Sequence, residues 1–388
     1  MLKENLKYHH CLVFPDSKDI TYYFSPGRIN IIGEHIDYNG GLVFPCAISL
    51  GTYAAISLRD DDTISLYSEN FKENGVISFS LSNELLKTGI WVDYVKGVIS
   101  EMKTDGHRIT KGFNAYIFGN LPNGASLSSS ASLELLFAEI VRELNNLELS
   151  DLDLVKYSQR AENNFVGLHC GIMDQFAIGM SKKNYAILLD CATLKYDYAP
   201  LELGDNVILI MNTNKRRDLV TSKYNERCAE CAEGLQLIRS NYKEVTHLCE
   251  LEVSDLPEIE KVIADEVVYR RVRHVISEMG RVKKTFEALQ INNIELVGKY
   301  INESHKSLKE DYEVTGLELD TIVKLAQSCE GVLGARMIGA GFAGCAIAIV
   351  KSSAVEAVTK KVKAGYLEKI GYDCNIYIAE SNNRTTKI

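Results

Sequence analysis

The segment from residue 24 to residue 45 most constrains how this chain can fold, because it sets charged side chains between apolar runs. Arg28, Glu34, His35 and Asp37 fall within about one strand and one turn. Such polar density is costly to bury unless it is used, so it favours a binding site over an edge strand with a solvated turn. Carboxylates accept hydrogen bonds from hydroxyls, and Arg and His can donate to oxygen. The segment therefore predicts a site for a small polyhydroxylated ligand.

The size and charge of the chain limit the remaining possibilities. Its 388 residues, with 46% hydrophobic and 24% charged side chains, are typical of a globular protein with two or three domains, or with two lobes that share a cleft. A net charge of −9 argues against a nucleic-acid or membrane partner. No secretory signal opens the chain, no apolar run reaches the length of a membrane helix, and ten cysteines show no framework. We expect a monomeric cytoplasmic protein with reduced thiols.

The closest cysteine pair is Cys228 and Cys231, within a helical pattern. No second pair and no suitably spaced histidine accompanies it, so two thiols on a helix face are favoured over a zinc site.

The order of the expected elements is that of an α+β protein rather than the regular alternation of a doubly wound parallel sheet. Strands are expected at 46–58, 63–68, 76–80, 113–119, 207–212, within 331–350 and at 375–379. Helices are expected at 91–104, 128–145, 151–166 (with Asp151 as its N-cap), through most of the chain up to 329, and from 354. We expect two lobes, 1–205 and 206–388, around one cleft.

Residues 121–134, Leu-Pro-Asn-Gly-Ala-Ser-Leu-Ser-Ser-Ser-Ala-Ser-Leu-Glu, join an expected strand to an expected helix. Loop amides and the first helical N–H groups are unpaired, and with the helix dipole they can bind an anion. Ser128, Ser129 and Ser130 add hydroxyls that can donate hydrogen bonds or bind a metal. The Walker pattern is absent, which excludes a P-loop NTPase. On this local chemistry alone, a serine-capped helix without a ligand is the favoured reading.

Two further segments are ambiguous by themselves. Gly339 to Gly344 match G-x-G-x-x-G, but the strand-like run Cys-Ala-Ile-Ala-Ile-Val follows, whereas a dinucleotide-binding loop must open a helix. Asp174 is the lone carboxylate of Cys170–Gln175. It is equally compatible with a buried structural hydrogen bond and with a functional acid or base.

Taken together, these motifs resemble one family. Residues 24–45 resemble the first signature of the galactokinases, which are GHMP sugar and metabolite kinases, and 121–134 and 331–345 resemble the second and third GHMP motifs in order. The resemblance implies the GHMP fold, with two mixed lobes and the active site between them. It also implies transfer of the γ-phosphoryl of Mg-ATP to the anomeric hydroxyl of α-D-galactose. The implied products are galactose 1-phosphate and ADP, and the implied step is the first of galactose catabolism by the Leloir pathway.

The resemblance also implies roles for individual residues. Asp174 is expected to be the catalytic carboxylate, with Arg28 beside it. The expected sugar contacts are Glu34, His35, Ile36, Asp37, Gly171 and Tyr224. The expected ATP contacts are Ser68, Trp91, Gly124, Ala125, Ser126, Leu127, Ser128, Ser129 and Ser130. The expected magnesium ligands are Ser130 and Glu162.

Three positions depart from the family pattern. Ser126 and Ala343 replace the usual Gly, and Ile338 replaces the usual Thr. If position 126 needs a positive φ, serine would strain the loop. These departures keep open a galactose- and ATP-binding regulator without catalysis. A GHMP kinase for another sugar, such as N-acetylgalactosamine, also stays open, because nothing in the sequence sizes the pocket around the second carbon of the sugar.

Overall fold

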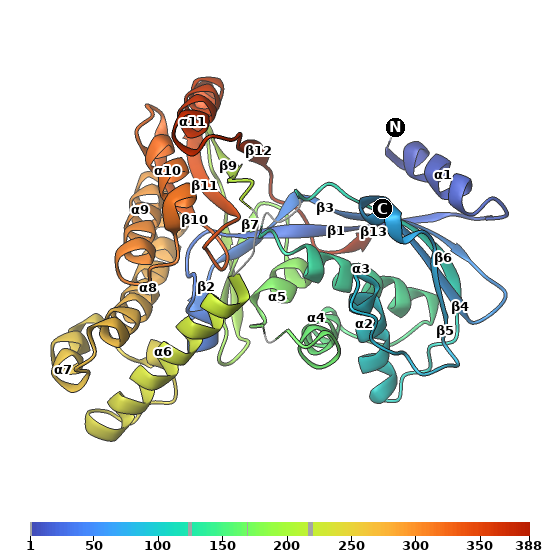
Figure 1. The fold of residues 1–388 in the computed structure, drawn as a ribbon, viewed down its shortest axis with the longest axis horizontal. Coiled ribbons are helices and arrows are strands. Elements are labelled where there is room, and N and C mark those ends of the chain that lie inside the picture. Colours follow the sequence, from blue (N-terminus) through green and yellow to red (C-terminus); the bar gives the residue numbers. More distant parts are fainter. Residues whose placement is uncertain (1, 123–125, 169, 216–219) are drawn as a thin grey trace.

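The computed structural model describes residues 2–122, 126–168, 170–215 and 220–388. In these ranges the N-terminal half of the chain, together with β13 from the C-terminal end, builds a six-stranded sheet in the order β13-β1-β3-β6-β4-β5 (Figure 1). Its neighbours are antiparallel except β4 and β6, which are parallel. The strands are β1 Thr21–Asn30, β3 Pro45–Leu58, β4 Thr63–Ser68, β5 Ile77–Ser80, β6 Phe113–Gly119 and β13 Thr386–Lys387.

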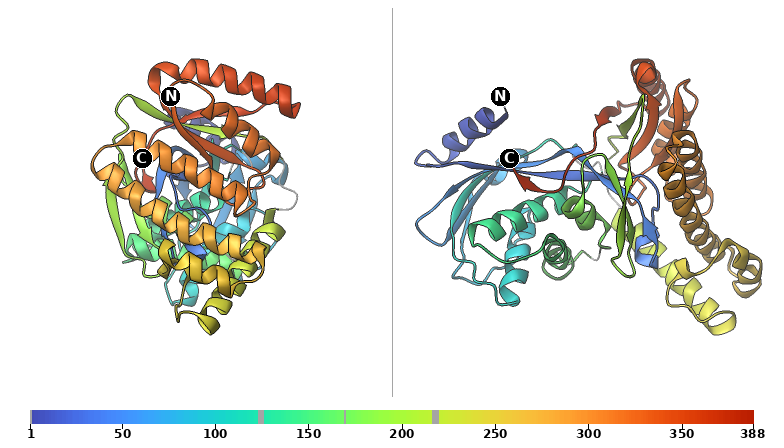
Figure 2. Two further views of the ribbon diagram at one scale, coloured as in Figure 1. Left: turned by 90° about the vertical axis from the view of Figure 1, so that its left-hand side faces the viewer. Right: turned by 180° about the vertical axis from the view of Figure 1, so that it is seen from behind.

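Helices cover both faces of this sheet (Figures 1 and 2). One face carries α2 Val92–Thr104, α3 Ser129–Leu144, α4 Asp151–Arg160 and α5 Met173–Met180, and a π-helical turn, Ala161–Val166, continues α4. The other face carries α1 Leu2–Val13, whose Leu6 packs on Ala55 and Tyr116. The strands therefore need apolar side chains on both faces, as β3 shows by burying nearly its whole length.

The second half of the chain forms a layer of helices beside a four-stranded antiparallel sheet, β10-β11-β9-β12 (Figure 2). The strands of this sheet are β9 Asn206–Asn212, β10 Val332–Met337, β11 Cys345–Lys351 and β12 Asn375–Ala379. The helices are α6 Val220–Asn241, α7 Leu256–Val262, α8 Glu266–Gln290, α9 Ile294–Glu310, α10 Gly316–Gln327 and α11 Val355–Ile370. A three-stranded sheet of β2 Leu42–Val43, β7 Tyr185–Asp190 and β8 Tyr196–Pro200 lies between the halves. Short 3₁₀ turns occur at Asp37–Asn39, Glu69–Asn74, Leu248–Glu250, Val253–Asp255 and Ser352–Ala354.

The α+β order expected from the sequence is confirmed, and the expected strands at 113–119 and 375–379 have the observed bounds. One detail was wrong: the N-cap of α4 is Ser150, not Asp151. The Ser150 hydroxyl accepts from the Asp153 amide, and the Asp153 carboxylate accepts from the Ser150 amide in return. This reciprocal pair satisfies two otherwise unpaired donors. The division into lobes near residue 205 stays a prediction, and β13 shows that the chain end returns to the first sheet.

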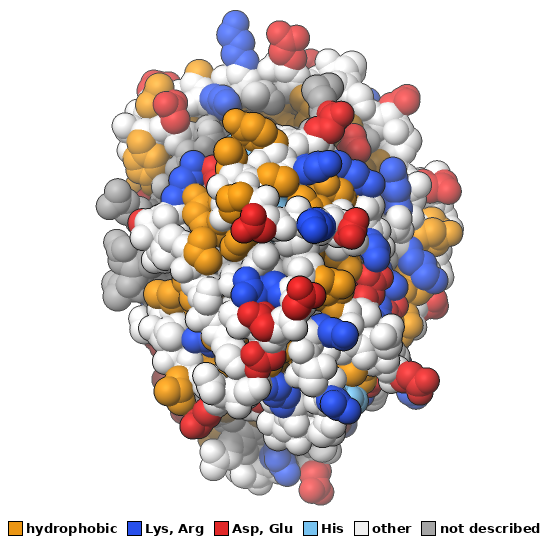
Figure 3. Space-filling view, turned by 90° about the vertical axis from the view of Figure 1, so that its right-hand side faces the viewer, with side chains coloured by type: hydrophobic (Ala, Val, Ile, Leu, Met, Phe, Trp, Pro, Cys, Tyr) orange, Lys and Arg blue, Asp and Glu red, His pale blue; other side chains and the backbone are white. Residues whose placement is uncertain are grey.

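The surface fits the modest net charge. Figure 3 shows the end of the molecule that lies at the right of Figure 1, where Lys and Arg side chains are interspersed with Asp and Glu. None of the helices in the part of the chain that the structure describes has an apolar stretch long enough to cross a bilayer.

Candidate active site

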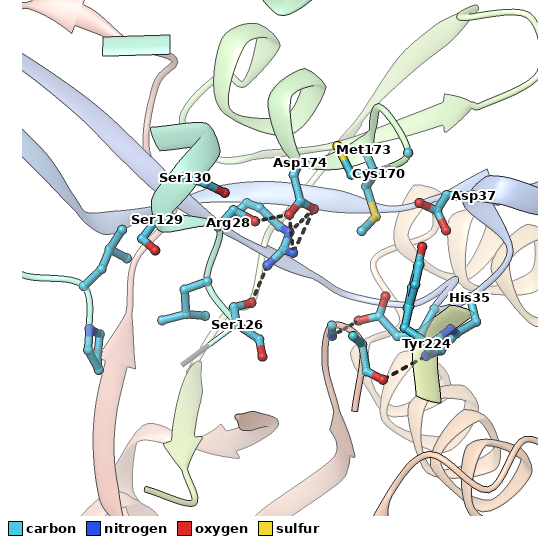
Figure 4. Close-up of a pocket in the computed structure, with 18 residues that line it drawn as sticks. Arg28, His35, Asp37, Ser126, Ser129, Ser130, Cys170, Met173, Asp174 and Tyr224 are labelled. Atoms are coloured by element: carbon cyan, nitrogen blue, oxygen red, sulfur yellow. Dashed lines mark hydrogen bonds and ion pairs between the residues drawn. The ribbon is translucent and has the colours of Figure 1, made fainter. Parts of the chain in front are cut away.

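A cavity of about 260 Å³ lies where the two halves of the molecule meet (Figure 4). One side of the cavity is formed by β1, the loop after it and the starts of α3 and α5. The other side is formed by α6 and the loop after β10. Its lining includes Arg28, Glu34, His35, Asp37, Ser126, Leu127, Ser128, Ser129, Ser130, Gly171, Asp174 and Tyr224. The structure thus brings together the sugar signature (residues 24–45), the serine loop (residues 126–130) and the carboxylate of Asp174.

Asp174, in the first turn of α5, is held by a bidentate ion pair with Arg28 (Figure 4). The guanidinium donates from Nε to Oδ1 and from Nη2 to Oδ2, both at 2.8 Å. Its third nitrogen, Nη1, donates to the main-chain oxygen of Ser126 at 2.6 Å. The Ser128 hydroxyl also donates to Asp174 Oδ2. Two parallel charged hydrogen bonds fix both position and orientation, so this carboxylate faces the cavity in a defined pose.

The serine loop closes against β1. The Arg28 amide donates to the Leu127 oxygen at 3.2 Å, and a Cβ on Gly27 would lie 2.7 Å from that oxygen. Ser126 and Ser128 both have positive φ, +59° and +60°. The Ser128 side chain does not cap α3, because its hydroxyl is turned to Asp174. The first amides of α3 therefore keep their capacity to bind an anion at the cavity.

Asp37 and Gly171 form the opposite end of the cavity. Asp37 begins a 3₁₀ turn, and a Cβ on Gly171 would lie 2.3 Å from its Oδ2. Position 171 therefore requires glycine for the carboxylate to sit there. Burial, with the negative charge of Asp174, raises the pKa of Asp37 to about 7.

His35 and Tyr224 close this end from the side. His35 has a φ of +64°, and its ring centre lies 5.7 Å from that of Tyr224 on α6. Burial lowers the pKa of His35 to about 3, so the imidazole is neutral at physiological pH. Burial also raises the pKa of Tyr224 well above its usual value, so the phenol keeps its proton.

Glu34 lines the cavity, but protein groups already engage both of its oxygens. Arg336 approaches Oε1 at 2.7 Å, the Gly339 amide donates to the same oxygen at 2.8 Å, and Asn30 donates to Oε2 at 2.6 Å. Burial raises the pKa of Glu34, an effect that Arg336 opposes. The carboxylate thus joins the loop after β1 to the loop after β10, a role that the sequence did not indicate.

A buried carboxylate cluster lies behind the serines. Gln175 donates from Nε2 to Glu162 Oε2 at 2.7 Å and to Glu134 Oε2 at 3.1 Å. Ser130 is a further hydrogen-bond partner of Glu162, so a hydroxyl and a carboxylate oxygen meet at the start of α3. Burial raises the pKa of both glutamates. Sequence reasoning missed Glu134 and Gln175, although a carboxylate on the apolar face of α3 was a signal for the first.

Five expected contacts are elsewhere or outside the described residues. Ser68 and Trp91 are buried away from the lining of this cavity, with the Trp91 ring stacked on Phe71 at 6.3 Å. Ile36 is fully buried in the core. Gly124 and Ala125 lie outside the described residues.

Comparison with known proteins gives the family. The galactokinase galactose-binding signature matches residues 10–58, the GHMP kinase N-terminal domain matches 93–182 and the GHMP kinase C-terminal domain matches 285–367. A galactokinase of Staphylococcus saprophyticus is 53% identical over 93% of this chain and 94% of its own length. The chain belongs to the galactokinase family. A galactokinase of Fusobacterium nucleatum is 46% identical over 99% of both chains.

Solved structures agree with this membership. The crystal structure of Lactococcus lactis galactokinase complexed with galactose matches with a TM-score of 0.96 and 46% identity over 100% of both chains. The mevalonate kinase of Methanococcus jannaschii, at 20% identity and a TM-score of 0.68 over 95% of this chain and 99% of its own, shares the fold. This galactokinase family member therefore has the GHMP kinase fold and is an ATP-dependent kinase.

The departures from the galactokinase pattern are now located. Ser126 has the positive φ that would favour glycine. Ile338, directly before the glycine loop after β10, and Ala343, within that loop, are both buried. Their effect on nucleotide and sugar stays a prediction.

Proposed function

We propose that the cavity between Asp174 and Tyr224 transfers the γ-phosphoryl group of ATP to the anomeric hydroxyl of α-D-galactose. The products are galactose 1-phosphate and ADP. This reaction is the first step of galactose breakdown by the Leloir pathway. The observation that carries the proposal is the bidentate Arg28–Asp174 pair, which lies where the galactokinase signature meets the serine loop.

The sugar contacts Asp37, Gly171, Tyr224 and His35. The Asp37 carboxylate lines the cavity from the 3₁₀ turn after β1, and the Tyr224 phenol lines it from α6. Each can therefore bind a different hydroxyl of the sugar. The absent side chain at Gly171 leaves its backbone open to the sugar beside Asp37. Glu34 contributes through the lone pairs that Arg336, Asn30 and Gly339 leave open.

Asp174 orients the anomeric hydroxyl and accepts its proton. Arg28 balances the charge of Asp174 and of the incoming phosphoryl group. Because both are fixed before substrate binds, the rate comes mainly from positioning and electrostatics, as is general for phosphoryl transfer.

The serine loop and the start of α3 bind the nucleotide phosphates. The amides from Ser126 to Ser130 and the uncapped N-terminus of α3 supply donors. Only the family resemblance assigns Gly124 and Ala125 to ATP and Ser68 and Trp91 to the nucleotide pocket.

Ser130 and Glu162 would hold Mg²⁺. Their side-chain oxygens meet behind the phosphate loop, and oxygen is the ligand that this hard cation prefers. The described residues contain no group of three His, Cys, Asp or Glu side chains placed for a metal. Two protein oxygens are enough, since magnesium takes phosphate and water oxygens for the rest. When bound, the ion neutralises charge on the phosphates.

A coupled ADP-release assay over a panel of galactose, N-acetylgalactosamine and glucose tests the function. We expect turnover with galactose and a kcat/KM for the other sugars that is at least tenfold lower. Preference for N-acetylgalactosamine would favour the rival sugar kinase. Galactose binding without ADP release from any sugar would favour the regulator. We further propose a cytoplasmic monomer, which cell fractionation and sedimentation would test.

A further inference from the structure

A line of hydrogen bonds runs behind His35, away from the cavity. His35 Nε2 lies 3.2 Å from the Ala340 oxygen, and Nδ1 lies 2.9 Å from the Tyr38 hydroxyl. The Tyr38 hydroxyl lies 2.7 Å from that of Tyr312, and this in turn lies 3.1 Å from the Cys231 sulfur. Tyr312 is fully buried.

Elementary bonding rules fix the direction of this line. A carbonyl oxygen only accepts, so Nε2 must carry a hydrogen for Ala340. The buried ring is neutral, because burial lowers the pKa of His35 to about 3, so Nδ1 has only a lone pair and accepts from Tyr38.

Each phenol has a single hydrogen, which orders the rest of the line. The Tyr38 hydroxyl donates its hydrogen to Nδ1 of His35, so it can only accept a hydrogen bond from the Tyr312 hydroxyl. Tyr312 accepts from the Cys231 thiol. The line therefore runs Cys231, Tyr312, Tyr38, His35, Ala340, with every donor pointing the same way.

This line joins elements that are far apart in the sequence. Cys231 lies on α6, Tyr312 follows α9, Tyr38 lies in the 3₁₀ turn after β1, and Ala340 lies in the glycine loop after β10. His35 and Ala340 line the cavity, whereas Tyr38 and Tyr312 do not. The Tyr38 ring also packs edge-on against the ring of Tyr224 in the lining, with ring centres 5.4 Å apart. A Tyr38→Phe change keeps that ring and removes only the hydroxyl, so it tests the contact with His35.

We propose that Tyr38, supported by Tyr312, is a positioning residue of the sugar site that holds His35 as the Nε2–H tautomer. In that state the ring donates to the Ala340 carbonyl and fixes the glycine loop against the sugar signature. The Gly339 amide next to it binds Glu34, so the loop and the signature are fastened at two adjacent points. Without the Tyr38 hydroxyl, Nδ1 is a buried acceptor with no donor, and the imidazole gains by turning or by changing tautomer.

Nitrogen NMR of histidine-labelled, sugar-free protein tests the tautomer directly. The His35 signal is assigned by its loss in His35→Gln. We expect wild type to show a protonated Nε2 and an unprotonated Nδ1, and Tyr38→Phe to show a changed or mixed tautomer. A wild-type ring protonated at Nδ1 would overturn the proposal.

Kinetics of two phenylalanine variants test the consequence. We expect Tyr38→Phe to raise the galactose KM about tenfold, since it strands a buried acceptor, and Tyr312→Phe to raise it about twofold to threefold, since Tyr38 still donates to His35. Both should keep kcat and the KM for ATP within about twofold, because neither phenol touches the reacting atoms. Tyr23→Phe is the matched control: it removes a buried phenol that donates to Glu143 at 2.6 Å, away from the cavity, and should leave the galactose KM unchanged.

This inference rests on the proposed sugar site, and the two can fail separately. If wild type shows the expected His35 tautomer but does not bind galactose, the proposed function is overturned, whereas the hydrogen-bonded line from Cys231 to Ala340 stands. Wild type that phosphorylates galactose, with an unchanged His35 signal and KM in Tyr38→Phe, would overturn the inference. If Tyr38→Phe does not fold, the tautomer of wild type and the KM of Tyr312→Phe against Tyr23→Phe decide.

Discussion

Single residues in this cavity are held by partners that leave them little freedom. Asp174 receives hydrogen bonds from Arg28 and Ser128, and Asp37 fits only because Gly171 has no side chain. Such fixed groups do not have to reorganise when substrate arrives, which is what phosphoryl transfer needs from a protein.

We expect Asp174→Asn to lower kcat by about 10²–10⁴-fold while galactose binding survives, because a general base contributes about that much. Steady-state kinetics and calorimetric galactose titration measure the two effects. Asp61→Asn is the matched control, since Asp61 makes the same bidentate pair with Arg59 on the surface. A variant of Asp174 that keeps more than a tenth of kcat would remove this carboxylate from the proton transfer.

Asp37 links sugar binding to the pH dependence of stability. Its pKa is raised to about 7 by burial and Asp174, against about 3.9 for an unfolded aspartate. Between these values the unfolded chain loses the proton more easily, so this group lowers the free energy of unfolding as pH rises through that window. Above pH 7 its effect is constant.

Asp37→Asn removes this titration. We expect the sugar-free variant to have a free energy of unfolding higher than wild type by on the order of 2 kcal/mol at pH 8, and by less at pH 5. The galactose KM should rise at the same time, so the variant would be more stable but would bind the sugar less well. Urea unfolding at the two pH values measures the difference. A difference that does not change with pH would contradict the assigned cause.

Among the elements, those with strong periodicity could be predicted from the sequence and those without it could not. The strands β6 and β12 and the helices α2 and α3 are close to expectation. Helix α5 was missed because its eight residues are buried nearly all round, which leaves no amphipathic period. Helix α1 and the strands β7 and β8 were missed as well.

The site was predictable where its residues are close in the sequence or match a motif. Arg28, Glu34, His35 and Asp37 do converge, as their spacing indicated. Their partners were not predictable: the Gly339 amide that binds Glu34 is 305 residues away, and Tyr312 is 274 residues from Tyr38. No local pattern reports a contact that only the tertiary fold creates.

The serine loop allows a test at the scale of an element. Ser126 has a φ of +59°, where a residue with a Cβ costs about 1–2 kcal/mol more than glycine. We expect Ser126→Gly to keep or improve ATP affinity and to change the free energy of unfolding by less than about 1 kcal/mol, since the added freedom of the unfolded chain offsets the relieved strain. Fluorescence titration with ATP at fixed Mg²⁺ and urea unfolding measure both.

Ser128→Gly is the contrast. It relieves a similar φ of +60° but removes the hydroxyl that donates to Asp174, so kcat should fall while that of Ser126→Gly does not. A severalfold loss of ATP affinity in Ser126→Gly would instead show that its hydroxyl binds nucleotide.

At the scale of the whole molecule, buried charges join the two halves. Arg336 is fully buried, and its guanidinium pairs with Glu34 at 2.7 Å and donates to the Ile31 oxygen at 3.1 Å. On the other side of the same loop, buried Glu278 on α8 accepts from the Gly33 amide at 3.1 Å. The loop that carries the sugar signature thus takes its shape from the C-terminal half, and sugar binding should depend on the integrity of both.

A double-mutant cycle on Glu34 and Arg336 tests this connection. Removing one partner leaves the other as an uncompensated buried charge, so Arg336→Met and Glu34→Gln should each lower the free energy of unfolding by about 3–5 kcal/mol. The double variant buries neither charge and should lose clearly less than the sum of the two. The exposed pair Arg59 and Asp61 gives the matched cycle, with an expected coupling of at most about 1 kcal/mol. Urea unfolding of all the variants at pH 7.5 supplies the energies, with the unfolding slope checked for two-state behaviour. Additive losses at Glu34 and Arg336 would mean that the pair does not hold the halves together, and that the loop owes its shape to Glu278 and the surrounding packing instead.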